Sequence, residues 1–338
     1  MMSTEQLTDK FERPLRDLRI SVTDRCNFRC PYCMPAEIFH EKFQFMQRQK
    51  LLTFEEIERL TRIIVRLGAV KLRLTGGEPL VRQKVDKLVT MLINIDGVDD
   101  MAMTTNAFLL PKFAQQLKDA GLQRFTVSLD SLNNTVFRHM NGERADVQQV
   151  LDGIQAAKDV GFDNIKINCV VQRGVNDHTL VEMARWARDN GHILRFIEYM
   201  DVGTMNGWQL DEVVPAKEIA EKIDAAFPIE RVKRHYASET ALRYVYKDGV
   251  GEIGIIASVS MPFCGNCSRM RLSPEGKIYT CLFATEGTDL KTPLRAGASD
   301  DEIEQIIRDT WGERIDRYSE ERTGNTKDRD KIEMYYIG

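Results

Sequence analysis

Leu18-Arg19-Ile20-Ser21-Val22 alternates apolar and polar side chains, and the chain continues after it as Cys26-Asn27-Phe28-Arg29-Cys30-Pro31-Tyr32-Cys33. This alternation is typical of a half-buried β-strand. Three thiols therefore follow the end of one strand within a few residues. Thiolates are soft ligands that suit zinc, copper(I) and iron–sulfur clusters. We interpret the stretch as a metal site at the carboxyl end of a strand.

Two kinds of metal site compete for these thiols. A structural zinc site closes its tetrahedron with a fourth Cys or His, and His40 is the only candidate close in the sequence. A four-iron cluster held by Cys26, Cys30 and Cys33 alone would keep one iron open for a small molecule. The spacing of three residues, then two, with no second pair nearby, favours the cluster and leaves zinc as the alternative.

Length and composition are those of an ordinary globular enzyme. The 338 residues allow two domains, or one large barrel with an appendage. The net charge of −4 favours neither nucleic acid nor an anionic membrane as a partner. The N-terminal residues lack the apolar core of a signal peptide, and no segment approaches a membrane span. We therefore expect a cytoplasmic protein whose clustered cysteines serve metal or redox chemistry rather than disulfides.

Strand-like and helix-like segments alternate along the first two thirds of the chain. Such alternation predicts a parallel sheet with right-handed crossovers. Helical patterns separate the strands, and glycines follow several of them, as helix C-caps do. The expected strands cover residues 18–22, 70–74, 101–104, 124–129, 165–171 and 193–197.

The alternation of apolar and polar residues along these strands predicts a hollow on the polar side of the sheet. Leu72 and Leu74 alternate with polar neighbours, and the later strands repeat the pattern. Helices must cover the apolar face, so the polar face looks elsewhere. We predict an incomplete (βα)6 TIM-like barrel whose lumen holds cations such as Arg19, Arg73 and Lys166; an open sheet with one solvent-facing side is the alternative. The expected parts are an N-terminal lead-in (1–17), the partial barrel (18–200) and a C-terminal extension with a second metal site (201–338).

Cys264, Cys267 and Cys281 form that second set of thiols. No Cys or His follows Cys281, so a zinc site would need a distant fourth ligand, and a second open cluster competes with it on equal terms. Arg269 and Arg271 lie just beyond the pair and face one way if extended. Guanidinium groups suit phosphate, although a solvated pair of arginines is the plainer interpretation.

Longer motifs give the sequence a family resemblance. The cysteine loop, followed by Gly76-Gly77-Glu78-Pro79 after the next strand, resembles the radical S-adenosylmethionine superfamily. Within it the chain closely resembles the GTP 3′,8-cyclase family, whose members catalyse the first step of molybdenum cofactor biosynthesis. The motifs that carry this narrower resemblance are Thr104-Thr105-Asn106, Val127-Ser128-Leu129-Asp130, Arg195-Phe196-Ile197-Glu198 and the second cysteine set with Arg269 and Arg271.

The resemblance implies cofactors and a site. Cys26, Cys30 and Cys33 would hold a [4Fe-4S] cluster that chelates S-adenosylmethionine, and the second triad would hold another that binds the purine of GTP. No residue is assigned as an acid or base, because the expected chemistry is radical. The implied S-adenosylmethionine-binding residues are Tyr32, Gly77, Ser128 and Met200, and the implied substrate-binding residues are Arg19, Arg73, Thr104, Lys166, Arg269 and Arg271.

The resemblance also implies partners and one departure. An external electron donor, a homodimer and a functional link to cyclic pyranopterin monophosphate synthase are expected. The family typically ends in Gly-Gly, whereas this sequence ends in Tyr336-Ile337-Gly338, and we expect the difference to affect activity rather than cluster assembly. The competing hypotheses are a radical enzyme that modifies a peptide and a zinc-binding regulatory protein.

Overall fold

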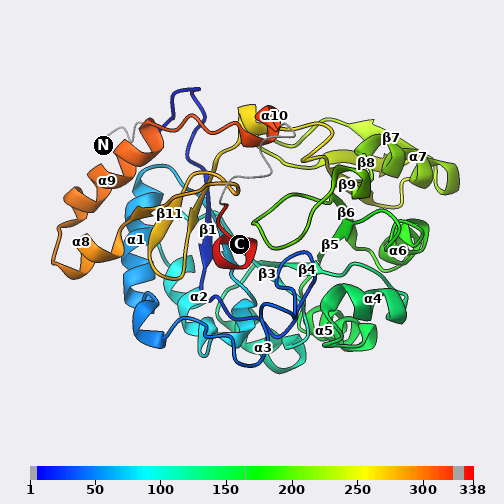
Figure 1. Ribbon diagram of the computed structural model, residues 1–338, viewed down its shortest axis with the longest axis horizontal. Coiled ribbons are helices and arrows are strands. Elements are labelled where there is room, and N and C mark those ends of the chain that lie inside the picture. The colour runs from blue at the N-terminus through cyan, green and yellow to red at the C-terminus, as the bar shows by residue number, and fades with distance from the viewer. Residues whose placement is uncertain (1–5, 164, 323–330) are drawn as a thin grey trace.

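The computed structural model describes residues 6–163, 165–322 and 331–338. Within them a curved sheet runs in the strand order β12-β11-β10-β1-β2-β3-β4-β5-β6-β9-β8-β7. Helices cover the outside of the curve, and the C-terminal end of the chain lies inside it (Figure 1).

The six central strands are parallel neighbours in chain order, as the sequence predicts. With the helices between them they form the predicted incomplete barrel. The strands are β1 (Asp17–Ser21), β2 (Lys71–Thr75), β3 (Asp100–Thr105), β4 (Arg124–Ser128), β5 (Lys166–Val171) and β6 (Ile193–Glu198). The helices are α1 (Phe54–Arg66), α2 (Val85–Ile93), α3 (Leu110–Asp119), α4 (Asn134–Asn141), α5 (Val147–Asp159) and α6 (Leu180–Asp189).

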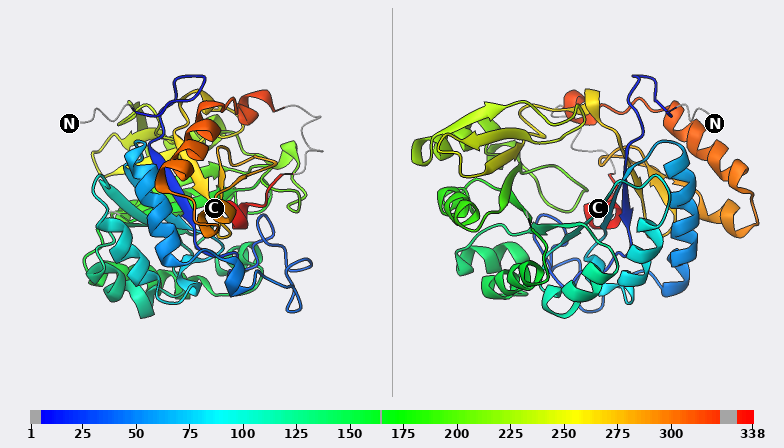
Figure 2. Two further views of the ribbon diagram at one scale, coloured as in Figure 1. Left: turned by 90° about the vertical axis from the view of Figure 1, so that its left-hand side faces the viewer. Right: turned by 180° about the vertical axis from the view of Figure 1, so that it is seen from behind.

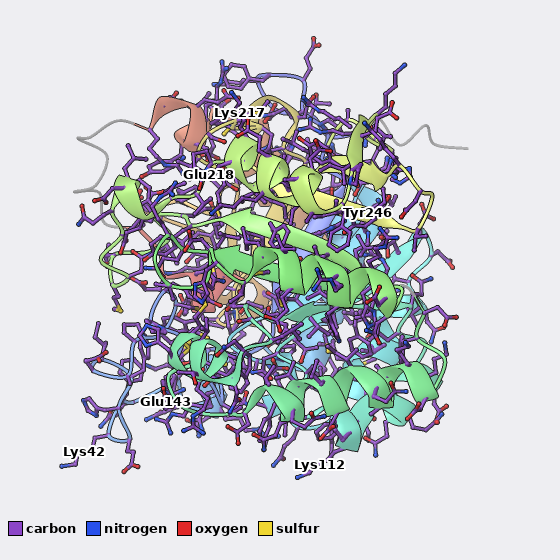
Figure 3. All side chains as sticks on the ribbon, turned by 90° about the vertical axis from the view of Figure 1, so that its right-hand side faces the viewer. Lys42, Lys112, Glu143, Lys217, Glu218 and Tyr246 are labelled. Atoms are coloured by element: carbon purple, nitrogen blue, oxygen red, sulfur yellow. The ribbon has the colours of Figure 1, made fainter. Side chains whose placement is uncertain are left out.

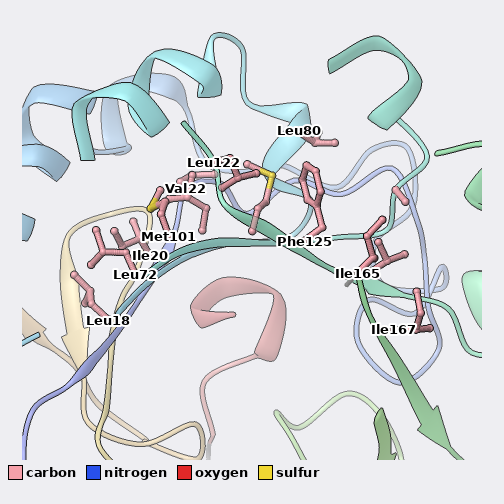
Figure 4. Packing of buried hydrophobic residues seen from close by; sticks show 14 of the residues in the cluster. Leu18, Ile20, Val22, Leu72, Leu80, Met101, Leu122, Phe125, Ile165 and Ile167 are labelled. Atoms are coloured by element: carbon pink, nitrogen blue, oxygen red, sulfur yellow. The ribbon is translucent and has the colours of Figure 1, made fainter. Parts of the chain in front are cut away.

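Local sequence explains where these elements begin and what they bury. Thr53 and Glu56 form a capping box at the start of α1, so two backbone N–H groups without helical partners are satisfied. The apolar phase of each strand packs against the helices, and Leu72, Phe125 and Ile167 are almost completely buried (Figure 4). Burying each such side chain contributes about 1.5–3 kcal/mol. The opposite phase of every strand is thereby directed into the hollow.

The C-terminal third of the chain extends both edges of this sheet. At one edge β10 (Arg269–Leu272) pairs in parallel with β1. At the other, β9 (Glu252–Ile256) pairs in parallel with β6. The remaining strands are β7 (Ile229–Val232), β8 (Leu242–Tyr246), β11 (Lys277–Tyr279) and β12 (Thr288–Asp289), and the remaining helices are α7 (Ala216–Ala226), α8 (Lys291–Arg295), α9 (Asp300–Gly312), α10 (Tyr318–Glu321) and α11 (Met334–Ile337).

The two outer groups of strands leave the barrel open between them, and α11 enters the hollow (Figure 2). The division of the chain after residues 17 and 200 stays a prediction. Among the described residues, no helix is both long and apolar enough to cross a membrane.

Candidate active site

The first cysteine triad lies on the loop that follows β1. Cys26, Cys30 and Cys33 are each partly buried. Burial raises the pKa of Cys30 well above its usual value, and the negative charges of Cys26 and Cys33 raise it further. The three groups are therefore held as thiols at the carboxyl end of β1, and a cationic metal centre beside them would favour their thiolate forms.

The Gly-Gly-Glu-Pro motif packs directly against this loop. Gly77 donates its N–H to the carbonyl oxygen of Thr23 at 2.8 Å, and Glu78 donates to that of Arg25 at 2.8 Å. A Cβ atom on Gly77 would overlap the Arg25 carbonyl, so only glycine permits this contact. Glu78 accepts hydrogen bonds from Leu80 N, Thr105 Oγ1 and Asn106 N, and burial raises its pKa to about 7.

The four residues implied to bind S-adenosylmethionine occupy the ends of different strands. Tyr32 donates its hydroxyl to Asp130 Oδ2 at 2.7 Å, and Asp130 also accepts from Val170 N. Ser128 ends β4 and Gly77 follows β2. Met200 follows β6 and lines the cavity that contains the second triad. The structure thus brings the first triad and these positions to the carboxyl ends of the strands.

The second triad lies at the opposite end of the barrel. Cys264 and Cys267 immediately precede β10, and β10 runs parallel to β1. Cys281 follows β11, which is antiparallel to β10 and so ends beside its start. The first triad follows the carboxyl end of β1, whereas the second adjoins its amino end. β1 has five residues, a length of about 16 Å, so the two triads lie near opposite ends of this strand.

A buried ion-pair network contacts the backbone of the second triad. Arg13 donates to the carbonyl of Cys264 at 2.9 Å, and Arg314 donates to that of Cys267 at 2.7 Å. Asp9 accepts from both arginines, at 2.6 and 3.3 Å, and all three side chains are almost wholly excluded from solvent. The N-terminal segment before β1 therefore fixes the backbone that presents these thiols.

Rows of cations separate the two triads. The strand register aligns Arg271, Arg19 and Arg73 across β10, β1 and β2. Burial and the charge of Arg269 lower the pKa of Arg19 to about 10, and burial and the charge of Arg19 lower that of Arg73 to about 9. Arg73 donates to Thr104 Oγ1 at 3.1 Å. These groups repel one another, so the hollow favours a polyanion.

Lys166 and two further arginines complete this cationic lining. Burial lowers the pKa of Lys166 to about 7, with contributions from the charges of Arg195, Arg124 and Arg73. Arg124 and Arg195 also line the cavity that holds Arg19 and Arg73. They were not among the substrate-binding residues expected from the sequence. Both occupy the polar phase of β4 and β6, so strand phase is the signal that could have found them, as it does Lys166.

Arg269 contacts the second triad, and Arg271 contacts the tail of the chain. Arg269 donates through Nε and Nη2 to Cys267 Sγ at 3.3 and 3.2 Å. Burial would raise the pKa of the Cys267 thiol, but Arg269 and Arg314 lower it to about 6. Arg271 donates to the carbonyls of Ile337 and Gly338, and Arg19 also donates to Gly338. The C-terminal tail thus contacts two arginines of the row, Arg271 and Arg19.

The donor set of each triad fits an iron–sulfur cluster. In the described part of the chain, no three His, Cys, Asp or Glu side chains are grouped so that they could hold a metal ion. A four-iron cluster has a different geometry, because each thiolate binds its own iron. Both sets supply three partly buried thiols, and the seventh cysteine, Cys169, is fully buried in the core.

Comparison with known proteins agrees with this architecture. The model of the radical SAM superfamily matches residues 20–187, and the model named Molybdenum Cofactor Synthesis C matches residues 192–320. The solved structure of Streptococcus suis SuiB bound to S-adenosylmethionine aligns with a TM-score of 0.63 at 15% identity and covers 96% of this chain and 72% of that one. At this identity the likeness concerns the fold alone.

The fold and the first cysteine motif define a radical S-adenosylmethionine protein, a class that implies a four-iron cluster and S-adenosylmethionine. Relatives identify the group within it. GTP 3′,8-cyclases from Acidothermus cellulolyticus, Xanthomonas axonopodis and Staphylococcus haemolyticus are 48%, 46% and 47% identical to this chain, with 98–99% of it and 99% of each relative covered. The chain belongs to the GTP 3′,8-cyclase family.

The buried network of Asp9, Arg13 and Arg314 makes a testable contribution to stability. In an Asp9→Asn variant, Arg13 and Arg314 lose their shared counter-ion while they stay buried, so we expect the free energy of unfolding to fall by about 3–5 kcal/mol. Anaerobic urea denaturation measures this change. The matched control is Glu313→Gln, which removes the exposed partner of Lys10 and should cost about 1 kcal/mol or less. Equal effects of the two substitutions would contradict the assigned role.

Proposed function

We propose that this chain catalyses the reaction of its family, the conversion of GTP to (8S)-3′,8-cyclo-7,8-dihydroguanosine 5′-triphosphate, the first step of molybdenum cofactor biosynthesis. One observation supports this assignment above the others. A hollow lined by buried cations lies between two three-thiol sets, and no described carboxylate pairs with Arg19 or Arg73 within it. A triphosphate supplies the negative partner that these two arginines lack.

Cys26, Cys30 and Cys33 would hold the cluster that binds S-adenosylmethionine. When bound, these two groups together supply a carbon-centred radical able to take hydrogen from C3′ of the ribose. The protein's part is placement: Gly77 lets the backbone approach closely, Tyr32 is fixed by Asp130, and Ser128 and Met200 lie at the carboxyl ends of β4 and β6. The partly buried loop would also limit the access of water and stray hydrogen donors to the reactive centre.

Arg19, Arg73, Thr104 and Lys166 would bind the triphosphate together with Arg271. Their strands belong to one hydrogen-bonded sheet, so the cations are positioned before substrate arrives and little reorganisation is needed on binding. Phosphate oxygens would replace the backbone oxygens of Ile337 and Gly338 on Arg271 and Arg19. A triphosphate brings several negative charges to these guanidinium groups, more than the tail oxygens carry, which favours this exchange.

A second [4Fe-4S] cluster on Cys264, Cys267 and Cys281 would receive the purine. Arg269 bridges the two parts of this arrangement, because it contacts Cys267 and lies in register beside Asp17 at the start of β1. With the base at this end and the ribose nearer the first triad, C3′ and C8 would be held between the two centres. The expected electron donor, the homodimer, the link to cyclic pyranopterin monophosphate synthase and the cytoplasmic location remain proposals.

The reaction itself tests the function. Anaerobic protein with reconstituted iron, GTP, S-adenosylmethionine and dithionite should yield the cyclised nucleotide and 5′-deoxyadenosine together. Both products should depend on GTP, because the substrate fills the hollow. Deoxyadenosine formed equally without GTP would indicate a peptide-modifying radical enzyme instead. Failure to form either product from protein with full iron content would refute the assignment.

Iron content tests the second cluster separately. The native protein should contain about eight irons per chain, the sum of two four-iron clusters. A Cys264→Ala, Cys267→Ala, Cys281→Ala variant should retain about four, and the equivalent variant of the first triad should also retain about four. About four irons in the native protein, or zinc in place of iron at the second triad, would exclude the second cluster.

Proton uptake tests the contact between Lys166 and the triphosphate. Because the pKa of Lys166 is lowered to about 7, this amine is largely neutral at pH 8 and charged at pH 6. An anion beside it should raise the pKa again, so binding should take up to about one proton per chain at pH 8 and little at pH 6. Calorimetry with GTP alone, in buffers of different ionisation enthalpy, measures this uptake.

Lys166→Met should abolish the uptake and weaken GTP binding about 10- to 100-fold. The matched control is Lys112→Met, at an exposed position on α3, which should leave both quantities unchanged. Uptake that persists in Lys166→Met would show that another group is responsible.

A further inference from the structure

A cationic groove lies outside the barrel, beside the first cysteine loop. It is open and has a volume of about 730 Å³. One wall is formed by Thr23 and Arg25 at the start of the cysteine loop, another by residues 46–55, and the third by the segment after Gly-Gly-Glu-Pro. Five cations and one carboxylate line it: Arg25, Arg48, Arg82, Lys84, Lys87 and Glu55.

These five cations have no ion-pair partner among the described residues. Many other arginines on the same surface are paired, as Arg59 is with Asp300 and Arg295 with Glu56. In the groove, Arg82 instead donates to the neutral carbonyls of Val22 and Leu52. Burial lowers the pKa of Arg82 to about 10, and the nearby charge of Arg48 contributes to this lowering. Arg82 also lies over the ring of Phe54, at 4.7 Å from its centroid. Like charges are thus held near one another without a carboxylate paired to them.

Two of the five cations, Lys84 and Lys87, lie at the start of α2. Lys84 is the N-cap of α2, with φ at +61°, a left-handed conformation that residues with side chains rarely adopt. Lys87 lies in the first turn, next to Asp86, the acidic residue of that turn. Cations are unfavourable at a helix N-terminus, where the helix dipole is positive. Both lysines are exposed, so they contribute no packing that would offset this cost.

The groove adjoins the loop that carries the first triad. Arg25 directly precedes Cys26, and its carbonyl accepts the N–H of Glu78 at 2.8 Å. The groove wall and the triad are therefore consecutive parts of one loop. The substrate cations lie elsewhere, on strands that face the hollow. The groove is therefore suited to a partner that acts on the cluster rather than to GTP.

We propose that this groove docks an acidic electron-carrier protein that reduces the cluster of the first triad. The inference rests on the proposed function, since radical formation consumes an electron that the chain does not itself supply. One electron leaves the reduced flavin or iron–sulfur group of the carrier, which is oxidised by one electron, and enters the cluster; no proton or bond is exchanged. The chain as a whole carries −4, so attraction for an acidic partner must come from a local patch such as this one.

The test compares two reductants on charge-reversed enzyme. Lys84→Glu/Lys87→Glu is the variant, and Lys112→Glu/Lys217→Glu on α3 and α7, whose side chains are labelled at the outer surface in Figure 3, is the matched control. Cyclised product is measured with dithionite and with photoreduced acidic flavodoxin or ferredoxin, from low to physiological salt. With the carrier, the groove variant should be slowed about 10-fold or more and lose its salt dependence. With dithionite, native, variant and control rates should agree.

Each other outcome decides against the proposal. Unchanged carrier-driven rates in the groove variant would overturn it, as would the failure of either carrier to drive native enzyme that is active with dithionite. Retention of RNA or heparin that depends on these lysines, with carrier rates intact, would assign the groove to another polyanion. If the native enzyme forms no cyclised product with dithionite, the proposed function is refuted instead. Iron content and circular dichroism of each variant exclude misfolding; if the variant fails either, Arg48→Glu replaces it under the same criteria.

Discussion

The alternation of side chains along parallel strands is the constraint on which this structure depends. Because neighbouring strands keep one register, Arg271, Arg19 and Arg73 must share a face once Leu18, Leu72 and Met270 are buried against the helices. Several like charges are thereby forced into one hollow, where burial lowers their pKa values. The apolar face stabilises the fold, and the cationic face makes the hollow suited to a polyanion.

The architecture was predictable because it follows from short-range patterns. Strand phase separates apolar from polar faces, and cysteine spacing alone locates both triads in the sequence. The pairing of β10 with β1 was not predictable, since no local pattern shows which distant segments become neighbours. The placement of the second triad at the amino end of β1 depends on that pairing.

Buried polar contacts between remote segments were also not predictable from the sequence. Asp9 and Arg13 lie in what the sequence indicates is a polar lead-in, yet they form a buried network with Arg314. Trp311 could not be placed from its neighbours; it is completely buried and donates to the carbonyl of Arg13 at 3.2 Å. Such residues are polar or isolated in the sequence, and only tertiary partners make their burial favourable.

The parallel contact between β1 and β10 also has a consequence for biosynthesis. Ser268, at the start of β10, donates to Asp17 in β1 across 251 positions of sequence. Ribosomes add about 5–20 residues per second, so one edge of β1 stays unpaired for on the order of 10–50 s until β10 has been synthesised. During that interval an unpaired strand edge and three adjacent thiols are exposed together. The nascent chain is therefore most vulnerable to aggregation and oxidation at its first strand.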